Sequence, residues 1–169
     1  MAGGSLYYWD TCLLLAWIND ENRKTGEMDG VRDVVEKARR REVKLLTSVL
    51  TTVEVLECKL PVGFATLFHD FMKRVERVNI DPKVANLAHD LRNHYMVRRG
   101  EFQNKTLSTP DALHLATAIL YRADEFHTFD EEGSGKSLGL IPLSNDVGGH
   151  RLRICKPETR SPSLDLRRP

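Results

Sequence analysis

Short apolar segments alternate with longer helix-forming segments along nearly the whole chain. The short segments, rich in apolar, β-branched and aromatic residues, are predicted as strands: 5–9, 43–48, 75–80, 125–129 and 151–155. The longer segments are predicted as helices: 11–19, 31–41, 51–59, 62–74, 82–99 and 109–121. Alternating strands and helices are typical of an α/β fold whose parallel sheet carries helices on both faces. We therefore predict a three-layer α/β/α domain with a mostly parallel central sheet of about five strands.

The length of 169 residues fits one domain with a tail. We place the domain at 1–156 and expect the Pro-, Ser- and Arg-rich residues 157–169 to be disordered. The net charge is only +1, but residues 151–169 hold six basic and two acidic residues, so the rest of the chain is slightly acidic. A phosphate-binding site in the domain must therefore rely on local Lys and Arg residues or on a metal ion.

Composition excludes several classes of protein. No apolar run approaches the roughly 20 residues that cross a bilayer, so we expect no membrane association. The apolar run near the N-terminus has no preceding Lys or Arg, contains Asp10 and lacks a small-residue cleavage site, unlike a signal peptide. Cys12, Cys58 and Cys155 form no CxxC pair, which argues against a thiol-rich zinc site and fits a reducing cytoplasm.

Four acidic residues lie near predicted strand ends or at a helix start. Asp10 follows the first strand, Glu54 follows the second, Asp111 opens the helix before the fourth strand, and Asp130 follows the fourth strand. In parallel α/β sheets the functional crevice lies beyond the carboxyl ends of the strands, so all four can meet there. Thr128 lies two residues before Asp130 and points to the same side.

Each acid also has a local structural explanation. Asp10 and Asp130 suit helix caps or turns, and Asp111 suits the first turn of a helix. Thr51 and Glu54 have the spacing of a capping box, and Glu57, one turn further on, competes for any role given to Glu54. Taken together, four carboxylates in one crevice would raise one another's pKa values unless a cation bound there. Carboxylate oxygens favour a hard ion such as Mg²⁺ or Mn²⁺.

The chain resembles the PIN-domain nucleases, and among them the VapC-type toxins of type II toxin–antitoxin systems. The resemblance covers residues 5–156 and rests on the order of four motifs: YYWDTCLLLAWI, LLTSVLTTVEVLE, TPDALHLATAI and ADEFHTFDEE. It implies that the catalytic and metal-binding acids are Asp10, Glu54, Asp111 and Asp130, supported by the hydroxyl residues Thr11 and Thr128. We expect direct metal ligation by Asp10 and Asp111, with Glu54 and Asp130 as second ligands or water-positioning bases.

The resemblance also implies an activity and partners. The activity is metal-dependent hydrolysis of phosphodiester bonds in single-stranded or loop RNA, with Mg²⁺ or Mn²⁺ as cofactor. The partners are a cognate antitoxin and a second copy of the chain, for which the apolar helices within 51–58 and 62–72 are candidate surfaces.

Other functions fit the residues less well. A haloacid-dehalogenase-like phosphatase needs an Asp two residues after Asp10, where this chain has Cys12, and a phosphoacceptor receiver domain needs an acidic pair that is missing here. The non-enzymatic alternative is a nuclease-like α/β module that acts in protein or RNA binding without catalysis. His114 lies one turn after Asp111, and we expect it to be a packing or surface residue rather than a ligand.

Overall fold

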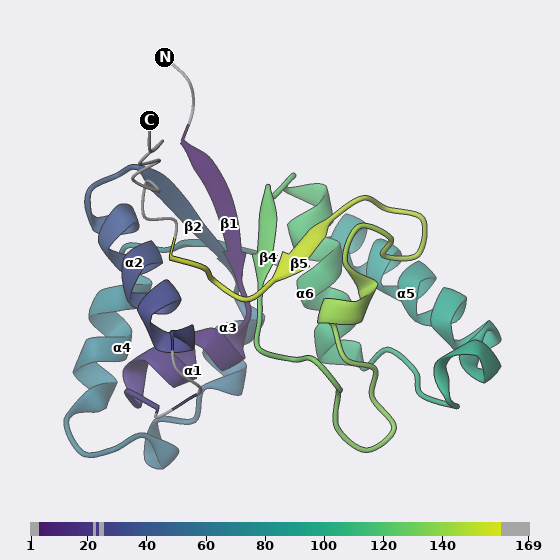
Figure 1. Ribbon diagram of the computed structural model, residues 1–169, viewed down its shortest axis with the longest axis horizontal. Coiled ribbons are helices and arrows are strands. Elements are labelled where there is room, and N and C mark those ends of the chain that lie inside the picture. Colours follow the sequence, from purple (N-terminus) through teal and green to yellow (C-terminus); the bar gives the residue numbers. More distant parts are fainter. Residues whose placement is uncertain (1–3, 22, 24–25, 160–169) are drawn as a thin grey trace, which may run out of the picture.

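A five-stranded parallel sheet forms the centre of the molecule (Figure 1). The computed structural model describes residues 4–21, 23 and 26–159. The strands are β1 (Ser5–Trp9), β2 (Val43–Ser48), β3 (Glu76–Val78), β4 (Glu125–His127) and β5 (Arg153–Cys155). Their order across the sheet is β3-β2-β1-β4-β5, and every neighbouring pair is parallel. The prediction of a parallel α/β sheet is confirmed.

Helices cover both faces of this sheet. They are α1 (Thr11–Ile18), α2 (Glu27–Arg39), α3 (Leu50–Glu54), α4 (Phe64–Met72), α5 (Pro82–Val97) and α6 (Thr109–Leu120). Short 3₁₀ turns follow at η1 (Glu57–Lys59), η2 (Arg99–Phe102) and η3 (Ile141–Leu143). Figure 1 shows α1, α2 and α4 on one side of the sheet and α5 and α6 on the other, which gives three layers. Among the described residues, no helix is both long and apolar enough to span a bilayer.

The central strand β1 supplies side chains to two separate cores. Tyr7 and Trp9 are buried with residues of α1, α2 and α4, whereas Tyr8 is buried with residues of α5 and α6. This division follows from the strand geometry, because successive side chains point to opposite faces of a sheet. Burial on both faces explains why the segment is apolar almost throughout.

The predicted helix 51–59 is interrupted in the structure. The helix α3 ends at Glu54, and Val55 adopts an extended conformation (φ −81°, ψ 104°) before the separate turn η1. Val55 is 4% exposed and joins the core under α1, α2 and α4. A continuous helix would not direct this side chain into that core, so burial of Val55 outweighs the local helix preference.

Pro157 and Glu158, after β5, lie against the helix α2 at Gly30. Pro157 is buried, and its carbonyl oxygen lies 1.9 Å from the position that a Cβ atom on Gly30 would take. A glycine at position 30 is therefore needed for this close approach. Residues 160–169 lie outside the described residues, so disorder of the tail remains a prediction.

The chain order creates a crevice beside β1. The strands β2 and β3 extend the sheet on one side of β1, and the chain then crosses to place β4 on its other side. This reversal is the topological switch point at which open α/β sheets place their ligands, beyond the carboxyl ends of the strands. The residues that follow β1, β2 and β4 therefore surround one space.

Candidate metal centre

Asp10 lies at the junction between β1 and α1 but does not cap the helix with its side chain. Its carboxylate oxygen Oδ2 accepts hydrogen bonds from the hydroxyl of Thr128 (2.8 Å) and from the thiol of Cys12 (3.2 Å). The residue is only 9% exposed. Because the side chain is not used for capping, the local explanation for an acid at this position fails.

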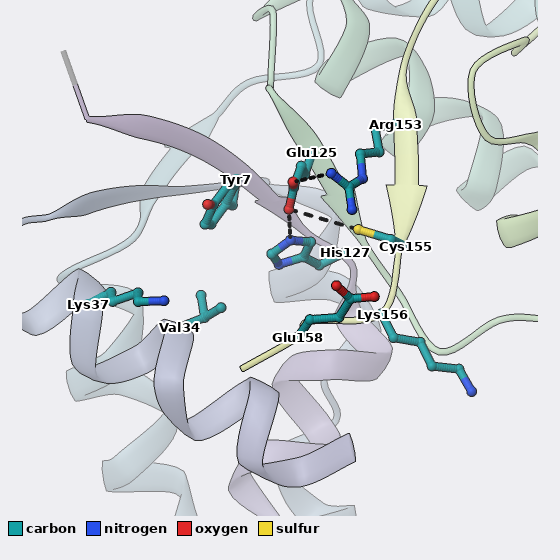
Figure 2. A pocket seen from close by; sticks show the side chains of 9 residues that line it. All are labelled: Tyr7, Val34, Lys37, Glu125, His127, Arg153, Cys155, Lys156 and Glu158. Atoms are coloured by element: carbon teal, nitrogen blue, oxygen red, sulfur yellow. Dashed lines mark hydrogen bonds and ion pairs between the residues drawn. The ribbon is translucent and has the colours of Figure 1, made fainter. Parts of the chain in front are cut away.

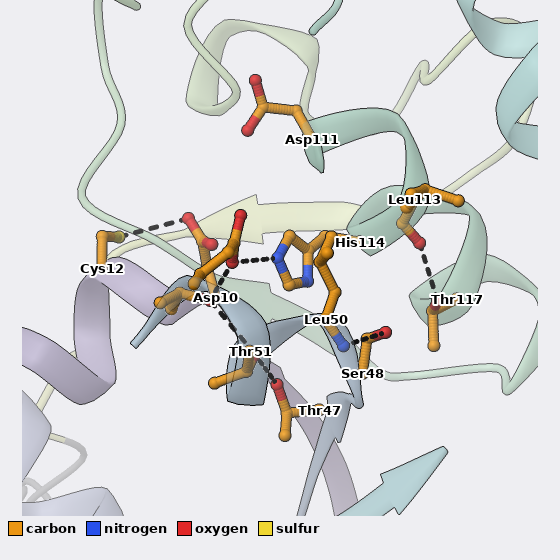
Figure 3. A network of polar contacts seen from close by, with 12 residues as sticks. Asp10, Cys12, Thr47, Ser48, Leu50, Thr51, Asp111, Leu113, His114 and Thr117 are labelled. Carbon is orange, nitrogen blue, oxygen red and sulfur yellow. Dashed lines mark hydrogen bonds and ion pairs between the residues drawn. The ribbon is translucent and has the colours of Figure 1, made fainter. Parts of the chain in front are cut away.

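Asp111 is held at the start of α6 by Ser108. The Ser108 hydroxyl donates to Oδ2 of Asp111 and accepts the backbone N–H of Asp111 at 3.2 Å. Ser108 is thus the residue that caps α6, whereas Thr109, which follows it, is the first residue of the helix. In Figure 3 the carboxyl group of Asp111 extends from the helix start toward the side on which Asp10 lies.

Glu54 ends the short helix α3 and is held from two sides. Its oxygen Oε2 accepts a hydrogen bond from the hydroxyl of Thr11 and contacts Nε2 of His114 at 2.9 Å. Thr51 does not form the expected capping box, because its hydroxyl contacts that of Thr47 at 2.8 Å. Glu57, the alternative acid, pairs with the exposed His69 instead. Thr11 therefore supports Glu54, while Thr128 supports Asp10.

Asp130 follows β4 in a tight turn. Its oxygen Oδ1 accepts the backbone N–H of Gly133 at 2.8 Å, and its own N–H donates to the Thr128 hydroxyl at 3.1 Å. Gly133 has a φ of +72°, a conformation that glycine adopts without a steric cost. The Thr128 hydroxyl thereby links the two acids, since it donates to Asp10 and accepts from the backbone of Asp130.

The four acids share one feature of their hydrogen bonding. In each case one carboxylate oxygen is held by protein donors, and no hydrogen bond from a described residue reaches the other oxygen. Donors placed in this way orient a carboxylate and leave an oxygen for a metal ion. An all-oxygen donor set suits Mg²⁺ or Mn²⁺, and Mg²⁺ usually keeps several waters and takes one or two carboxylates directly.

The electrostatics of the centre also favour a bound cation. Burial, reinforced by the charges of Asp10 and Asp130, raises the pKa of Asp111 despite the hydrogen bond from Ser108. Burial and the charge of Asp10 likewise raise the pKa of Asp130, although backbone N–H groups oppose the rise. These carboxylates are therefore costly to ionise together unless a positive charge offsets their repulsion.

His114 joins two elements of the centre, which the sequence alone did not reveal. It is 1% exposed, its Nδ1 lies 2.6 Å from the Tyr8 hydroxyl, and its Nε2 contacts Glu54. The Tyr8 hydroxyl also accepts the backbone N–H of Ser48 at 3.1 Å, so its own proton is available to Nδ1. In the neutral ring Nε2 then carries the proton and donates it to Glu54. His114 is therefore not a surface residue, and its role goes beyond packing.

The charges around His114 and Glu54 reinforce this contact. Burial alone would lower the pKa of His114, but the hydrogen bond to Glu54 and the charges of Asp10, Glu54 and Asp111 raise it overall. Burial alone would raise the pKa of Glu54, but the hydrogen bonds from His114 and Thr11 outweigh it and lower that pKa. Glu54 is thus kept ionised in a crevice where Asp111 and Asp130 resist ionisation.

Without divalent ions, we expect the Asp111→Asn variant to melt at a higher temperature than the wild type at pH 7. The raised pKa of Asp111 means that its ionised form costs stability above the ordinary value of 3.8, and this cost grows as the pH rises through the raised pKa. The advantage of the variant should therefore shrink as the pH falls from 7 toward 4. Thermal unfolding of both proteins in EDTA across this range measures it.

Glu54 titrates in both proteins and largely cancels from that difference in melting temperature. The charge of Asp111 helps to raise the pKa of His114, so its loss in the variant also reduces the advantage of the variant as the pH falls. An Asn at position 111 retains an oxygen that accepts the Ser108 hydroxyl, so helix capping is preserved. A difference that stays constant between pH 4 and 7, or that favours the wild type, would show that Asp111 is not under electrostatic strain.

Comparisons with known proteins identify the family to which the chain belongs. A family model described as the PIN domain matches residues 7–134. Comparison with curated protein sequences gives no match. Similar solved structures include VapBC2 from Rickettsia felis bound to a DNA fragment from the promoter, with a TM-score of 0.60, 16% identity, and coverage of 88% of this chain and 98% of that one.

Two further structures give similar values. DNA-bound VapBC from Salmonella typhimurium has a TM-score of 0.58 and 15% identity, over 89% of this chain and 98% of that one. A toxin–antitoxin complex from Klebsiella pneumoniae has a TM-score of 0.51 and 19% identity, over 91% and 98%. At these identities the structures establish a shared fold. The family model covers most of the sequence, including all four acids, and the chain therefore belongs to the PIN-domain family.

Proposed function

We propose that this PIN domain is a Mg²⁺- or Mn²⁺-dependent ribonuclease that hydrolyses phosphodiester bonds in single-stranded or loop RNA. We further propose that it acts in the cytoplasm as the toxin of a toxin–antitoxin pair. The observation that carries the proposal is the arrangement of the four acids, each with one oxygen held by protein donors. Such a set has no evident structural purpose, because repulsion among the acids opposes folding in the absence of a cation.

Asp10 and Asp111 would hold the ion directly, with Glu54 and Asp130 as second ligands or as groups that position water. A bound divalent ion lowers the pKa of a coordinated water and neutralises the charge that develops on phosphate. Glu54 is suited to position a water or to act as a second ligand, because His114 and Thr11 fix its orientation and keep it ionised. Thr128 and Ser108 fix the carboxyl groups of Asp10 and Asp111.

An antitoxin is the proposed protein partner, in keeping with the toxin–antitoxin complexes among the similar structures. A groove of about 320 Å³ between α2 and α4 is lined mainly by apolar side chains, including Trp17, Leu67 and Phe71. Grooves of this kind accept the apolar face of a helix. The groove lies on the α1, α2 and α4 side of the sheet, so an antitoxin helix seated there would pack beside the helices that follow β1 and β2.

A homodimer is the second proposed assembly, and it uses exposed apolar residues that follow β2. Val53 is 71% exposed, Leu56 is 47% exposed and Val62 is fully exposed. If these residues meet a second copy, the double variant Val53→Lys/Val62→Lys should be monomeric, because it buries charge in the interface. Light scattering after gel filtration measures the mass. Val97→Lys, at an 85% exposed site on α5, is the matched control and should leave the dimer intact.

Cleavage of RNA distinguishes the enzyme from a binding module without catalysis. The test uses a labelled single-stranded RNA and antitoxin-free protein, with Mg²⁺, with Mn²⁺ and with EDTA. The proposal predicts cleavage with either ion and none with EDTA. RNA binding without cleavage by folded protein under all three conditions would favour the binding module.

A further inference from the structure

A second cluster of metal-ligating side chains lies on the other face of β4, away from the four acids. Glu125 and His127 project from β4, and Cys155 projects from the neighbouring strand β5 (Figure 2). Successive residues of a strand point to opposite faces, so His127 faces Tyr7 while Thr128 faces Asp10. From this cluster we infer a second metal site, distinct from the acidic centre, in which Glu125, His127 and Cys155 bind Zn²⁺.

The ligand atoms of these three residues converge. Oε2 of Glu125 lies 2.8 Å from Nε2 of His127 and 3.8 Å from Sγ of Cys155. One ligand atom from each residue lies within 4.8 Å of the other two. Among the described residues, no three of the acids in the first centre bring their ligand atoms this close together. Zn²⁺ binds thiolate, imidazole and carboxylate ligands at 2.0–2.3 Å, so small side-chain shifts would complete the site.

The other ring nitrogen of His127, Nδ1, is left to carry the ring proton when Nε2 binds the metal. The side chain of His127 is 2% exposed, and its Nδ1 has no hydrogen-bond partner in the described part of the chain. A buried N–H at this position costs free energy unless a water accepts its hydrogen bond. The adjoining cavity, lined by His127, Glu125, Cys155 and Tyr7, has a volume of about 10 Å³. That is room for about one water-sized particle.

The basic residues around the cavity form ion pairs with neighbouring acids. Lys37 pairs with Asp33 at 2.6 Å, and Lys156 pairs with Glu27 and Glu131 at 2.6 Å each. Arg153 contacts the other oxygen of Glu125, Oε1, at 3.2 Å. The oxygen Oε2 contacts His127 and Cys155. Arg153 would act as the outer partner that orients the carboxylate ligand.

Binding involves a simple exchange of protons. The thiol of Cys155 loses its proton to solvent and becomes a thiolate ligand. His127 stays neutral, with one ring nitrogen on the metal and the proton on the other nitrogen. A water completes the fourth position of a tetrahedral site. The bound Zn²⁺ would link β4 to the edge strand β5 through their side chains. This link raises the stability of the edge of the sheet.

Titration with Co²⁺, which takes tetrahedral zinc sites, tests the inference through its thiolate charge-transfer band. We expect one equivalent of Co²⁺ to produce this band in tag-free, metal-stripped protein, and Zn²⁺ to abolish it. Cys155→Ser should lose the band. Cys12→Ser, Cys58→Ser and the double variant Asp10→Asn/Asp111→Asn should keep it, because their substitutions lie outside the cluster.

A measurement on the wild type avoids any folding defect in the variants. X-ray absorption of the protein with one equivalent of Zn²⁺ should show a single sulfur neighbour at about 2.3 Å. Zn²⁺ should also raise the melting temperature of the wild type but not of Cys155→Ser. A zinc ion without a sulfur neighbour, or a cobalt band that survives Cys155→Ser or disappears in Cys58→Ser, would overturn the inference. None of these three results changes the prediction of RNA cleavage at the acidic centre.

Discussion

Replacing Asp10 with Asn should reduce RNA cleavage by roughly a thousandfold or more. Metal ions supply several kcal/mol of transition-state stabilisation, and each 1.4 kcal/mol corresponds to a factor of about ten in rate. The Asn side chain retains an oxygen that accepts the hydrogen bond from Thr128, so the local structure is preserved. The loss should therefore come from weaker binding of the divalent ion. Initial cleavage rates of both proteins, measured across a range of Mg²⁺ concentrations that does not saturate the variant, give the ratio.

The same variant should be at least as stable as the wild type in EDTA. The charge of Asp10 contributes to the raised pKa values of Asp111 and Asp130, and its removal relieves that repulsion. Asp90→Asn, an exposed substitution on α5, is the matched control and should retain full activity. An Asp10→Asn protein that cleaves within a few fold of the wild type would remove Asp10 from the metal centre.

Replacing His114 with Ala should lower both stability and activity. The side chain is buried between Tyr8 and Glu54, so its removal leaves a cavity and takes away both hydrogen bonds, which costs about 2–4 kcal/mol of unfolding free energy. Loss of a residue that orients a metal ligand costs about 10–100-fold in metal affinity or activity. Chemical denaturation and Mn²⁺-dependent cleavage measure the two effects.

The Tyr8→Phe variant separates the positioning role of His114 from a purely structural one. It removes the hydrogen bonds of the hydroxyl to His114 and to the Ser48 N–H but leaves the contact with Glu54, so we expect a loss of about 1–3 kcal/mol and nearly unchanged Mn²⁺ affinity. His114→Ala should weaken Mn²⁺ binding as well. Unchanged Mn²⁺ affinity in folded His114→Ala protein would make this histidine a structural residue.

The overall fold was predictable because its signals are local. The apolar segment before Asp10 and the Asp81-Pro82 pair mark a strand end and a helix start, and the structure places β1 and α5 there, with Asp81 accepting the N–H of Val84. Helix boundaries were less predictable where tertiary contacts decide them. Val55 ends α3 because its side chain enters a core formed by distant residues.

The four acids of the candidate site, with Thr11 and Thr128 beside them, could be proposed from the sequence, but which hydroxyl holds which acid could not. Asp10 and Asp111 follow from strand ends and from the order of the motifs. Thr128 holds Asp10 and Thr11 holds Glu54 from distant positions, so no spacing along the chain reveals these pairs. His114 lies on the same helix as Asp111, yet only the fold brings Tyr8 and Glu54 to its two nitrogens.

The most direct test of the account is the position of Mn²⁺ in crystals of the protein, located by anomalous scattering. The account predicts a Mn²⁺ peak between the carboxylates of Asp10 and Asp111, with Glu54 and Asp130 as direct or water-mediated neighbours. A crystal form that cleaves RNA with Mn²⁺ but carries the ion away from these four residues would contradict it.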